Sequence, residues 1–550
     1  MKRRSTMVLL LSSVVLAGCG DNSGAGAVNL APDQNVTVAI AREFGSLDPA
    51  RLTSQADADV AGNLFNGVVR VSSVGGAVVP DLAVALPDLS SDGRTYTFHL
   101  RRGVNFSNGD PLTAGDFVYS WSRVAALQGP DAAIFSDVVG YSATVSGGAA
   151  GLAMSGLVAK GDLTLEVHLA APQGYLLDRL ASVAAAVVDR KVIASAGDPL
   201  GRGANQNWAN QPSTEVGTGP YRLAARAANS ADFSPVAGWW GDPKPVVRRL
   251  RLVVTPASSD PITAFIADSY DLVGYAGMEH LSVDALTRVR QGPSQELTTV
   301  ARGAFTWVGF NHKQGPFAGL DPPATKLRHA FALALDRTKI GSALCHDSGT
   351  CLPATGGPVP PGMRGYTGDE SDPLATFDPG QARSLLKQAD PDGSATKKLA
   401  IAFADTPENG AIFQFLQDQW QKNLGVRVEP LVPHSASSAG PGTAALVIQR
   451  WQARYDDPQQ LLDGYFATSA GPTGGGFSDP QFDKLAAKGD GEPAASSLGT
   501  YATAISRLQT DAAYVPLYYD SGNLLVGAHV VGAAMGTLAD GPWSSLEVLQ

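Results

Sequence analysis

The stretch TYTFHLRRGVNFSNGDPLTAGDFVYSWSR, residues 95–123, decides the fold of this chain. Polar and apolar residues alternate in TYTFHL, which predicts a β-strand over residues 95–100. Asn108-Gly109 is a tight-turn signal. The run that follows, residues 111–127, begins with proline and is predicted to be a helix. A strand followed closely by a helix is the repeating unit of an α/β fold.

Thr113 and Asp116 stand three residues apart at the expected start of that helix, like the two members of a capping pair. The same strand and helix patterns recur along the chain, and no internal repeat accompanies them. Further strands are expected at residues 36–41, 163–169 and 249–254, and further helices at residues 326–344 and 409–425. In residues 326–344, the side chains of Leu327, Phe331, Leu335 and Ile340 would lie along one face of a single helix.

The N-terminus has the order of an export signal, with Lys2, Arg3 and Arg4 followed by the apolar run Met7–Leu16. This apolar run of about ten residues is too short to span a bilayer, which takes about 20 residues as a helix. We therefore expect residues 1–18 to be a cleaved signal peptide.

The signal ends in LAGC, which matches the bacterial lipobox, in which the cysteine becomes the lipidated first residue of the mature chain. Cys19 is the predicted lipidation site. Residues 19–35 are mostly small and polar, and we expect them to form a flexible tether between the lipid and a folded body. The protein would then lie on the periplasmic or extracytoplasmic side of a membrane in the cell envelope.

The body of the chain is large and acidic. No later segment reaches about 18 consecutive apolar residues, so we expect it to be soluble. One hydrophobic core rarely exceeds about 250–300 residues, which predicts two or three lobes. Without the signal and its three basic residues, the formal net charge of −10 becomes −13. That charge argues against nucleic acid or anionic lipid as a partner.

Cys345 and Cys351 are the remaining cysteines, in a loop-like stretch. We expect a disulfide between them, because an exported chain can keep one. A metal site formed with His346 is the alternative, but it lacks the paired cysteine spacing of zinc modules. No metal and no cofactor are expected.

Four ordered segments resemble the family 5 extracellular solute-binding proteins, the peptide- and nickel-binding receptors of ABC transporters. The first is SLDPARLTSQADADVAGNLFNGVV at residues 46–69 together with residues 80–123, and the second is VGTGPYRL at residues 216–223. The third is WVGFNHKQGPFAGLDPPATKLRHAFALALDRTKI at residues 307–340, and the fourth is QRWQARYDDPQQLLDGYF at residues 449–466. The resemblance spans most of the chain.

The resemblance implies an α/β, periplasmic-binding-protein-like fold of type II, with two lobes joined by a hinge and an extra third domain. Domain I would be discontinuous, domain II continuous and inserted in it, and domain III would follow. The expected boundaries are residues 36–64, 213–300 and 516–550 for domain I, 65–212 for domain II, and 301–515 for domain III.

The fourth segment resembles the part of the family's sequence that lines the ligand-binding cleft. In the oligopeptide receptors this stretch lines the cleft, and the aspartate of its A-D-Y motif holds the peptide's N-terminal ammonium. Trp451, Ala453 and Tyr455 keep the family spacing here, but Arg454 stands at the position of that aspartate. A guanidinium only donates hydrogen bonds, so it suits a carboxylate or phosphate and not an ammonium.

Three accounts of this reversal remain open. Asp456 or Asp457 holds the amine after a local shift, or the ligand presents an anionic or neutral end to Arg454. In the third account Arg454 turns outward, or pairs with Asp457, and leaves the cleft neutral.

Alignment with the family places Thr53, Ser54 and Gln55 in a first cleft segment that runs beside a bound peptide. Its opposite segment would be formed by Arg450, Trp451 and Gln452. Paired backbone edges bond the main chain of a ligand and tolerate varied side chains. Trp451 and Tyr455 are expected to contact the ligand as cleft walls, and Arg454 to select its charge; Asp457 completes the expected binding residues.

The implied function is that of a monomeric substrate-binding component of an ABC importer. It would close two lobes around an oligopeptide or peptide-like solute and deliver it to the permease subunits. No nucleophile elbow, phosphate loop or H-E-x-x-H motif occurs, so we expect no enzyme activity. The alternative is the same fold with a non-peptide ligand: an oligosaccharide, an amino-acid conjugate, a metal chelate or a peptide-like antibiotic.

Overall fold

The structure is a computed structural model that describes residues 29–72, 76–147, 153–195, 198–202, 206–256, 259–274, 287–289, 296–345, 350–431, 442–471, 473 and 475–550. The predicted signal peptide, Cys19, most of the tether and His346 lie outside these residues. Within the described ranges, no helix is both long and apolar enough to cross a membrane.

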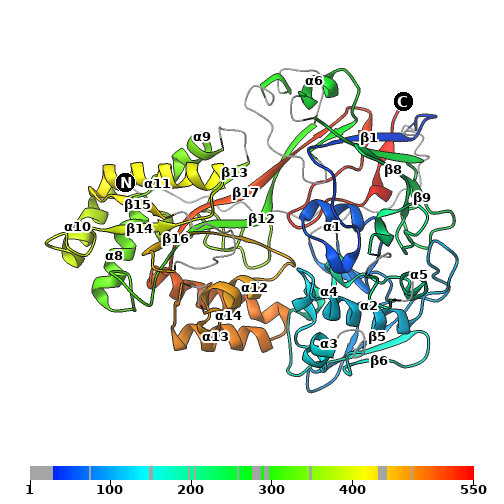
Figure 1. Ribbon diagram of the computed structural model, residues 1–550, viewed down its shortest axis with the longest axis horizontal. Coiled ribbons are helices and arrows are strands. Elements are labelled where there is room, and N and C mark those ends of the chain that lie inside the picture. Colours follow the sequence, from blue (N-terminus) through cyan, green and yellow to red (C-terminus); the bar gives the residue numbers. More distant parts are fainter. Residues whose placement is uncertain are drawn as a thin grey trace, which may run out of the picture.

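One large mixed sheet runs through the molecule (Figure 1). It has 11 strands, and its order is β15-β14-β16-β12-β17-β11-β1-β10-β9-β8, with β13 paired to β17. The strands are β1 (Asn35–Ile40), β8 (Tyr221–Ala227), β9 (Ser230–Pro235), β10 (Arg249–Val254), β11 (Leu272–Val273), β12 (Glu296–Phe310), β13 (Cys351–Pro353), β14 (Leu399–Ala402), β15 (Val428–Leu431), β16 (Leu446–Gln452) and β17 (Tyr514–Val526).

The two longest strands, β12 and β17, form an antiparallel ribbon that connects the two sides of the molecule (Figure 1). At one end Glu296 pairs with Val526, beside β11 and β1, and at the other Gly309 pairs with Tyr514, beside β16. The register shifts twice, once between Ala301 and Phe305. Such bulges bend a ribbon and increase its twist.

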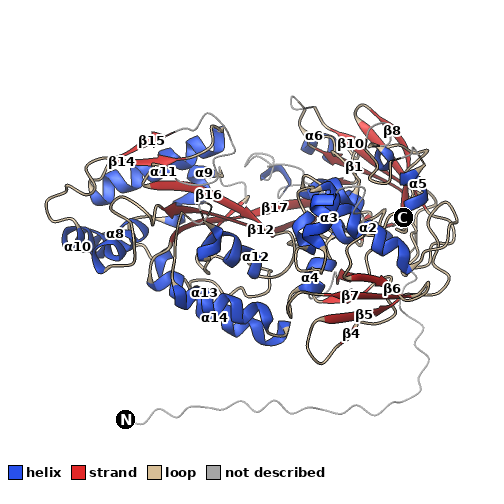
Figure 2. Ribbon diagram, turned by 60° about the horizontal axis from the view of Figure 1, so that its bottom comes forward, coloured by secondary structure: helices blue, strands red, loops and turns tan. Residues whose placement is uncertain are grey.

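A separate four-stranded sheet lies apart from the large one (Figure 2). Its order is β4-β5-β7-β6, and a hairpin of β2 and β3 lies nearby in the sequence. Its strands and the helices of the same region are β2 (Val69–Val71), β3 (Val78–Pro80), β4 (Asp88–Leu89), β5 (Thr95–His99), β6 (Leu157–Ala159), β7 (Thr164–His168), α2 (Ala114–Leu127), α3 (Tyr141–Gly147), α4 (Leu176–Leu180) and α5 (Arg190–Ala194). The predicted capping pair is confirmed, because Thr113 and Asp116 close a capping box at the start of α2.

The remaining helices pack mostly on the large sheet's β16 side. They are α8 (Pro322–Leu333), α9 (Ile340–Leu344), α10 (Pro379–Ala389), α11 (Pro407–Leu424), α12 (Gln459–Leu461), α13 (Pro480–Gly491) and α14 (Ala494–Thr510), whereas α1 (Gln55–Ala61), α6 (Pro261–Ile266) and the ladder of β18 (Val530–Val531) with β19 (Glu547–Val548) belong to the β1 side. The expected helix over residues 326–344 is wrong as a single element. It ends at Leu333, and Asp336 then caps a short 3-10 turn before α9 begins.

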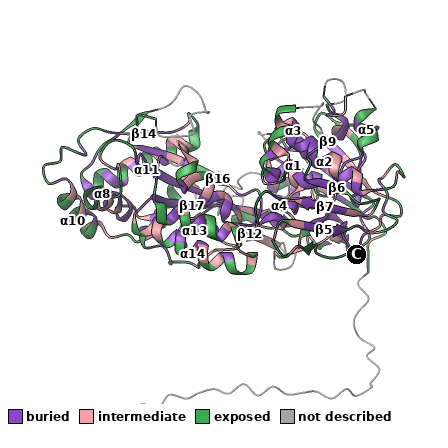
Figure 3. Ribbon diagram, turned by 90° about the horizontal axis from the view of Figure 1, so that it is seen from below, coloured by how far each residue is buried: buried purple, intermediate pink, exposed green. Residues whose placement is uncertain are grey.

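The described residues form three large hydrophobic cores and two small clusters. Figure 3 shows the buried segments on both sides of the molecule. The first large core draws on residues 36–65, 186–272 and 524–548, the second mostly on residues 68–187, and the third on residues 305–519. The fold is therefore the expected periplasmic-binding-protein-like α/β fold with separate lobes joined by a ribbon. The lobes built around these three cores are called lobe 1, lobe 2 and lobe 3, in that order.

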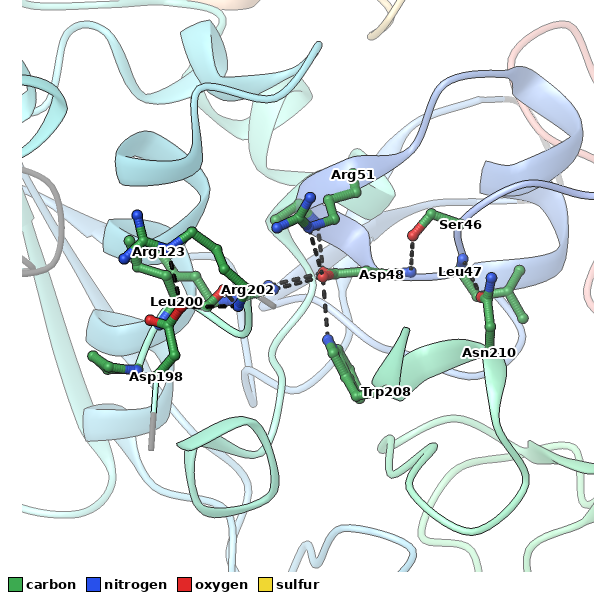
Figure 4. Close-up of polar contacts among 12 residues, drawn as sticks. Ser46, Leu47, Asp48, Arg51, Arg123, Asp198, Leu200, Arg202, Trp208 and Asn210 are labelled. Carbon is green, nitrogen blue, oxygen red and sulfur yellow. Dashed lines mark hydrogen bonds and ion pairs between the residues drawn. The ribbon is translucent and has the colours of Figure 1, made fainter. Parts of the chain in front are cut away.

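A buried ion pair explains the LDP turn near the N-terminus (Figure 4). The Asp48 carboxylate accepts hydrogen bonds from Arg123 Nη1 at 2.8 Å and Nη2 at 2.5 Å, and from Trp208 Nε1 at 3.1 Å. Burial raises the pKa of Asp48, but the Arg123 charge and these hydrogen bonds outweigh burial and hold it below its usual value. Asp48 thereby joins α2 of lobe 2 to the entry of lobe 1.

Candidate functional site

Thr53, Ser54 and Gln55 form the entry to α1. Ser54 is the N-cap, and its Oγ accepts a hydrogen bond from Asp57 N at 3.2 Å. The Asp57 carboxylate in turn accepts from Thr53 N at 3.2 Å, Ser54 N at 3.1 Å and the Thr53 hydroxyl at 2.9 Å. This capping box fixes the main chain of the first predicted segment and already uses two of its N–H groups.

The second predicted segment is the end of β16. On one side β16 pairs with β12, from Leu446 opposite Phe310 to Gln452 opposite Ala304. On the other side β14 pairs only with Leu446 and Val447. Within the part of the chain that the structure describes, no strand covers the outer edge of β16 from Ile448 to Gln452. An uncovered edge presents main-chain donors and acceptors to a further extended chain.

Arg302 brings the two segments together. Gln452 Nε2 donates to the Arg302 carbonyl at 2.8 Å. The Arg302 guanidinium donates to Asp540 Oδ1 at 2.7 Å and to Asp59 Oδ2 on α1 at 3.3 Å. Gln55 Nε2 donates to the same Asp59 carboxylate at 3.0 Å. A continuous set of polar contacts therefore leads from the start of α1 to the end of β16.

Trp451 does not lie on the exposed face of β16. Its side chain belongs to the core of lobe 3 and its residue is 5% exposed. Side chains alternate along a strand, so Arg450 and Gln452 point to the opposite face. Of the three residues in this segment, Arg450 and Gln452 offer side chains to a ligand, whereas Trp451 offers little surface in this conformation.

Tyr455 lies between lobe 2 and lobe 3. Its ring stacks on Tyr175, with centroids 6.5 Å apart and planes inclined by 17°. Arg179 Nε donates to the Tyr455 hydroxyl at 3.3 Å, and that hydroxyl donates to Gln459 Oε1 at 2.5 Å. The residue expected to be a cleft wall is thus buried in an aromatic and cationic contact between lobes.

Arg454 also turns toward lobe 2. Its Nε lies 3.4 Å from Asp131 Oδ1, with side chains that are 42% and 11% exposed respectively. Its backbone N–H donates to Gln460 Oε1 at 2.8 Å. Burial raises the pKa of the Asp131 carboxyl, and the Arg454 charge partly opposes that rise. The ion-pair partner in the structure is therefore Asp131. Asp457 was the partner in only one of the three accounts left open by the sequence.

Asp456 and Asp457 are both buried beside Arg364. Asp456 Oδ1 accepts the Arg364 backbone N–H at 2.8 Å, and Asp457 Oδ1 accepts the Gln459 N–H at 2.9 Å. Arg364 Nη1 donates to Asp178 of lobe 2 at 2.8 Å, while its Nη2 lies 3.8 Å from Asp457 Oδ2. Burial and the negative charge of Asp178 raise the pKa of Asp457 to about 7, although Arg364 opposes them.

These contacts form one charged interface, here called the interlobe seam. It consists of Asp131, Asp137, Tyr175, Asp178 and Arg179 from lobe 2, and Arg364, Arg454, Tyr455, Asp456 and Asp457 from lobe 3. Arg454, Tyr455 and Asp457 therefore serve, in this conformation, to hold lobe 3 against lobe 2.

A cavity of about 930 Å³ adjoins the C-terminal end of α1, where Ala58, Asp59 and Gly62 line it. Asp59, Asp81, Trp239, Trp240 and Asp456 are among its lining residues, and none of the nine predicted binding residues is. The two indole N–H groups both donate to the Thr218 carbonyl, at 2.9 and 3.0 Å, which fixes the rings. Burial raises the pKa of Asp59 to about 7, helped by the nearby Asp540 charge and opposed by Arg302.

Cys345 and Cys351 are joined in a disulfide, with Cα atoms 5.9 Å apart. The bridge holds β13 at the edge of β17. In the described ranges, no group of three or more His, Cys, Asp or Glu side chains could hold a metal ion.

Sequence reasoning missed the residues that organise the site: Arg302, Asp131 and Arg364. Each is a charged residue whose partner lies far away in the sequence, so no local pattern marks it. The spacing of the fourth segment pointed to a strand whose outer edge is uncovered, but spacing does not encode the direction of its side chains.

The family described as "Bacterial extracellular solute-binding proteins, family 5 Middle" matches residues 77–473. The oligopeptide-binding protein OppA of Bacillus subtilis is 24% identical over 507 residues, which cover 88% of each chain. A dipeptide-binding protein of Lactococcus lactis is 28% identical, over 86% of this chain and 85% of its own.

Among solved structures, the murein tripeptide-binding protein MppA in an unliganded open form has a TM-score of 0.78. It is 22% identical, and the match covers 96% of this chain and 99% of that one. At this identity the likeness shows the fold.

Proposed function

The chain belongs to family 5 of the bacterial extracellular solute-binding proteins, and we propose that it is the substrate-binding component of an ABC importer for oligopeptides. It would hold the peptide between lobe 1 and lobe 3 and pass it to the membrane permease. The relatives named oligopeptide- and dipeptide-binding proteins, which match most of their own length, support a peptide over the other solutes considered.

The observation that carries this proposal is the uncovered edge of β16 from Ile448 to Gln452. An extended peptide placed along this edge would bond through its main chain, whatever its sequence. The start of α1, linked to the same place through Arg302, would form the other side of the site. The expected contacts are thus main-chain contacts of Thr53, Ser54, Gln55, Arg450, Trp451 and Gln452, with side-chain contacts from Arg450 and Gln452.

The mechanism is binding without covalent chemistry. A peptide that touches both lobes stabilises the closed arrangement by its differential affinity for it. The bulged β12–β17 ribbon is the connection about which lobe 3 would move. We assign residues 36–64, 213–300 and 516–550 to domain I, 65–212 to domain II and 301–515 to domain III. The cores support most of this division, although residues 186–209 contribute to the core of lobe 1 and residues 517–519 to the core of lobe 3.

Attachment to the membrane follows from the N-terminal sequence. After removal of residues 1–18, a lipid on Cys19 and the tether up to residue 35 would hold a monomer on the extracytoplasmic side, close to the permease. Metabolic labelling with a radioactive fatty acid tests this. Incorporation should disappear in Cys19→Ala, and its persistence in that variant would contradict the lipobox assignment.

Calorimetry with a panel of peptides of two to nine residues, free and N-acetylated, tests the function itself. Binding of peptides with little dependence on side-chain identity is the expected result. The panel also contains an oligosaccharide, an amino-acid conjugate and a metal chelate. If one of these binds and no peptide does, the peptide assignment is wrong while the family assignment stands.

A further inference from the structure

One polar face of the β16–β12–β17 layer lies beside the uncovered edge. Arg450 of β16 pairs in register with Thr306 of β12, which pairs with Tyr518 of β17. Residues paired across strands share a face, and so do residues two apart in one strand. Asp520 therefore lies on this face with Tyr518, Arg450 and Gln452.

The Arg450 and Asp520 side chains form an ion pair that is open to solvent, with 47% and 23% of their surfaces exposed. Arg450 Nε donates to Asp520 Oδ2 at 3.1 Å, and Nη2 donates to the same oxygen. No described residue donates a hydrogen bond to Oδ1. Nη2 also reaches Gln452 Oε1 at 3.4 Å. A half-exposed pair of this kind is weak, so a second cation can compete for the carboxylate.

Glu408 adds a second carboxylate. It is exposed in the first turn of α11, where the helix N-terminus favours a negative charge. Tyr518, which is buried on the polar face, donates its hydroxyl to Glu408 Oε1 at 2.9 Å. The charges of Glu408 and Asp520 both act on Arg450. The three side chains together carry a net charge of one negative unit, which one positive charge would neutralise.

The other carboxylates near the start of α1 and the end of β16 already have hydrogen-bond or ion-pair partners within the protein. The Asp57 carboxylate accepts the hydrogen bonds of the α1 capping box, and the Asp59 carboxylate accepts hydrogen bonds from Arg302 and Gln55. Asp456 and Asp457 are buried in the interlobe seam. Asp520, which lies two strands from the uncovered edge on β17 and is reached by Arg450 of β16, and the exposed Glu408 remain as carboxylates accessible to solvent.

We propose that Asp520, assisted by Glu408, binds the N-terminal ammonium of the peptide, with Arg450 as the group that the ammonium displaces. This inference rests on the proposed function and replaces Arg454 as the residue that selects ligand charge. An α-ammonium offers three donors to two acidic side chains, and charge-assisted hydrogen bonds of this kind are among the strongest. The disulfide positions the carboxylate, because Cys351 at one end of the bridge pairs in register with Asp520.

Calorimetry measures the affinities of two forms of one pentapeptide, the first with a free amino terminus and the second N-acetylated. The wild-type protein should bind the free form about 10–100-fold more tightly, as a charge-assisted contact predicts. Asp520→Asn should bring the two affinities to within about threefold by weakening only the free form. Glu408→Gln should reduce the ratio less. Arg450→Gln should raise the ratio of free to acetylated affinity, because Asp520 loses its competitor, whereas a lost side-chain contact of Arg450 would weaken both peptides alike.

Asp418→Asn is the matched control, since Asp418 is an exposed carboxylate on the same helix that accepts a hydrogen bond from Gln414. It should keep the wild-type ratio. If Asp520→Asn also keeps that ratio, or if Arg450→Gln and Asp520→Asn weaken both peptides alike, the assignment of the ammonium site is wrong and peptide binding stands. Equal wild-type affinities for both peptides would overturn it in the same way. Failure of both peptides to bind would overturn the proposed function.

Discussion

Reversing the charge of Arg454 separates its two possible roles. In the structure Arg454 Nε lies 3.4 Å from Asp131 Oδ1, and the Asp131 side chain is 11% exposed. Exposed ion pairs contribute about 0–1 kcal/mol, whereas breaking a buried pair costs about 3–5 kcal/mol. This pair is intermediate, and Arg454→Asp also places a second carboxylate beside Asp131. We expect a loss of about 2 kcal/mol in the free energy of unfolding.

Thermal unfolding, followed by circular dichroism, measures this loss. At about 2–4 °C per kcal/mol for a unit of 150–250 residues, the midpoint should fall by about 4–8 °C. The swapped pair, Arg454→Asp with Asp131→Arg, should recover most of the difference, which a double-mutant cycle quantifies. Arg427→Asp is the control, because Arg427 pairs with Glu429 on the surface and its reversal should leave the midpoint unchanged.

The Arg454→Asp variant also tests whether Arg454 contacts the ligand. Affinity for free-amine peptides should stay as in the wild-type protein, because Arg454 points to lobe 2. A tenfold or greater gain in that affinity, with an unchanged midpoint, would refute the reasoning. It would show that Arg454 faces the ligand and that the interlobe seam does not depend on it.

Four further substitutions or conditions test the rest of the structure. Asp48→Asn should lower the free energy of unfolding by about 3–5 kcal/mol in denaturant titrations, because it leaves the buried guanidinium uncompensated. The pKa of Asp457, raised to about 7, means that the native state holds an extra proton between about pH 4 and 7, so unfolding free energy should increase as the pH is lowered from 8 to 5.5. Asp457→Asn should reduce that dependence without abolishing it, because burial also raises the pKa values of Asp59, Glu215 and Asp490 to about 7. Gly303→Ala should destabilise the ribbon, because Gly303 has φ of +59° and an added Cβ would lie 2.8 Å from a neighbouring side chain. Under non-reducing conditions, the intact mass of the protein should be two hydrogens lower than the mass calculated with Cys345 and Cys351 as free thiols.

For each of these predictions, one outcome would contradict the structural explanation. Asp198→Asn, which loses an exposed pair with Arg202 in the same region (Figure 4), should cost only a small fraction of the Asp48 loss, and equal losses would contradict the buried-pair account. An Asp457→Asn protein whose stability varies with pH as steeply as that of the wild type would contradict the raised pKa of Asp457. A fully stable Gly303→Ala protein would place the bend of the ribbon elsewhere, and two free thiols would remove the disulfide.

The local features of the fold could be predicted from sequence because their causes are local. The Thr113–Asp116 capping box lies within four residues, and the strand at residues 95–99 alternates as its burial requires. The helix expected over residues 326–344 failed for an equally local reason. Asp336 accepts a hydrogen bond from Thr338 N and so starts a new turn, a competing interaction that hydrophobic periodicity does not register.

The candidate site was only partly predictable. The resemblance predicted cleft segments at the end of β16 and the start of α1, and contacts of Arg302 link the two. Arg454, Tyr455 and Asp457, however, turn toward partners that lie far away in the sequence. Their partners depend on how lobe 2 packs on lobe 3, which no single segment encodes. The same limit hid Asp520, whose position beside Arg450 follows from the pairing of β12 with both β16 and β17.

The position of Arg302 explains how ligand and lobe movement would be coupled. It lies in the register shift between Ala301 and Phe305, where the ribbon bends, and its guanidinium bonds α1 while its carbonyl accepts from Gln452. A peptide between the start of α1 and the edge of β16 would therefore touch both sides of this bend. The interlobe seam lies outside this site and joins lobe 2 to lobe 3. In this account the charge of the ligand is recognised beside Arg450, and Arg454 holds lobe 3 against lobe 2.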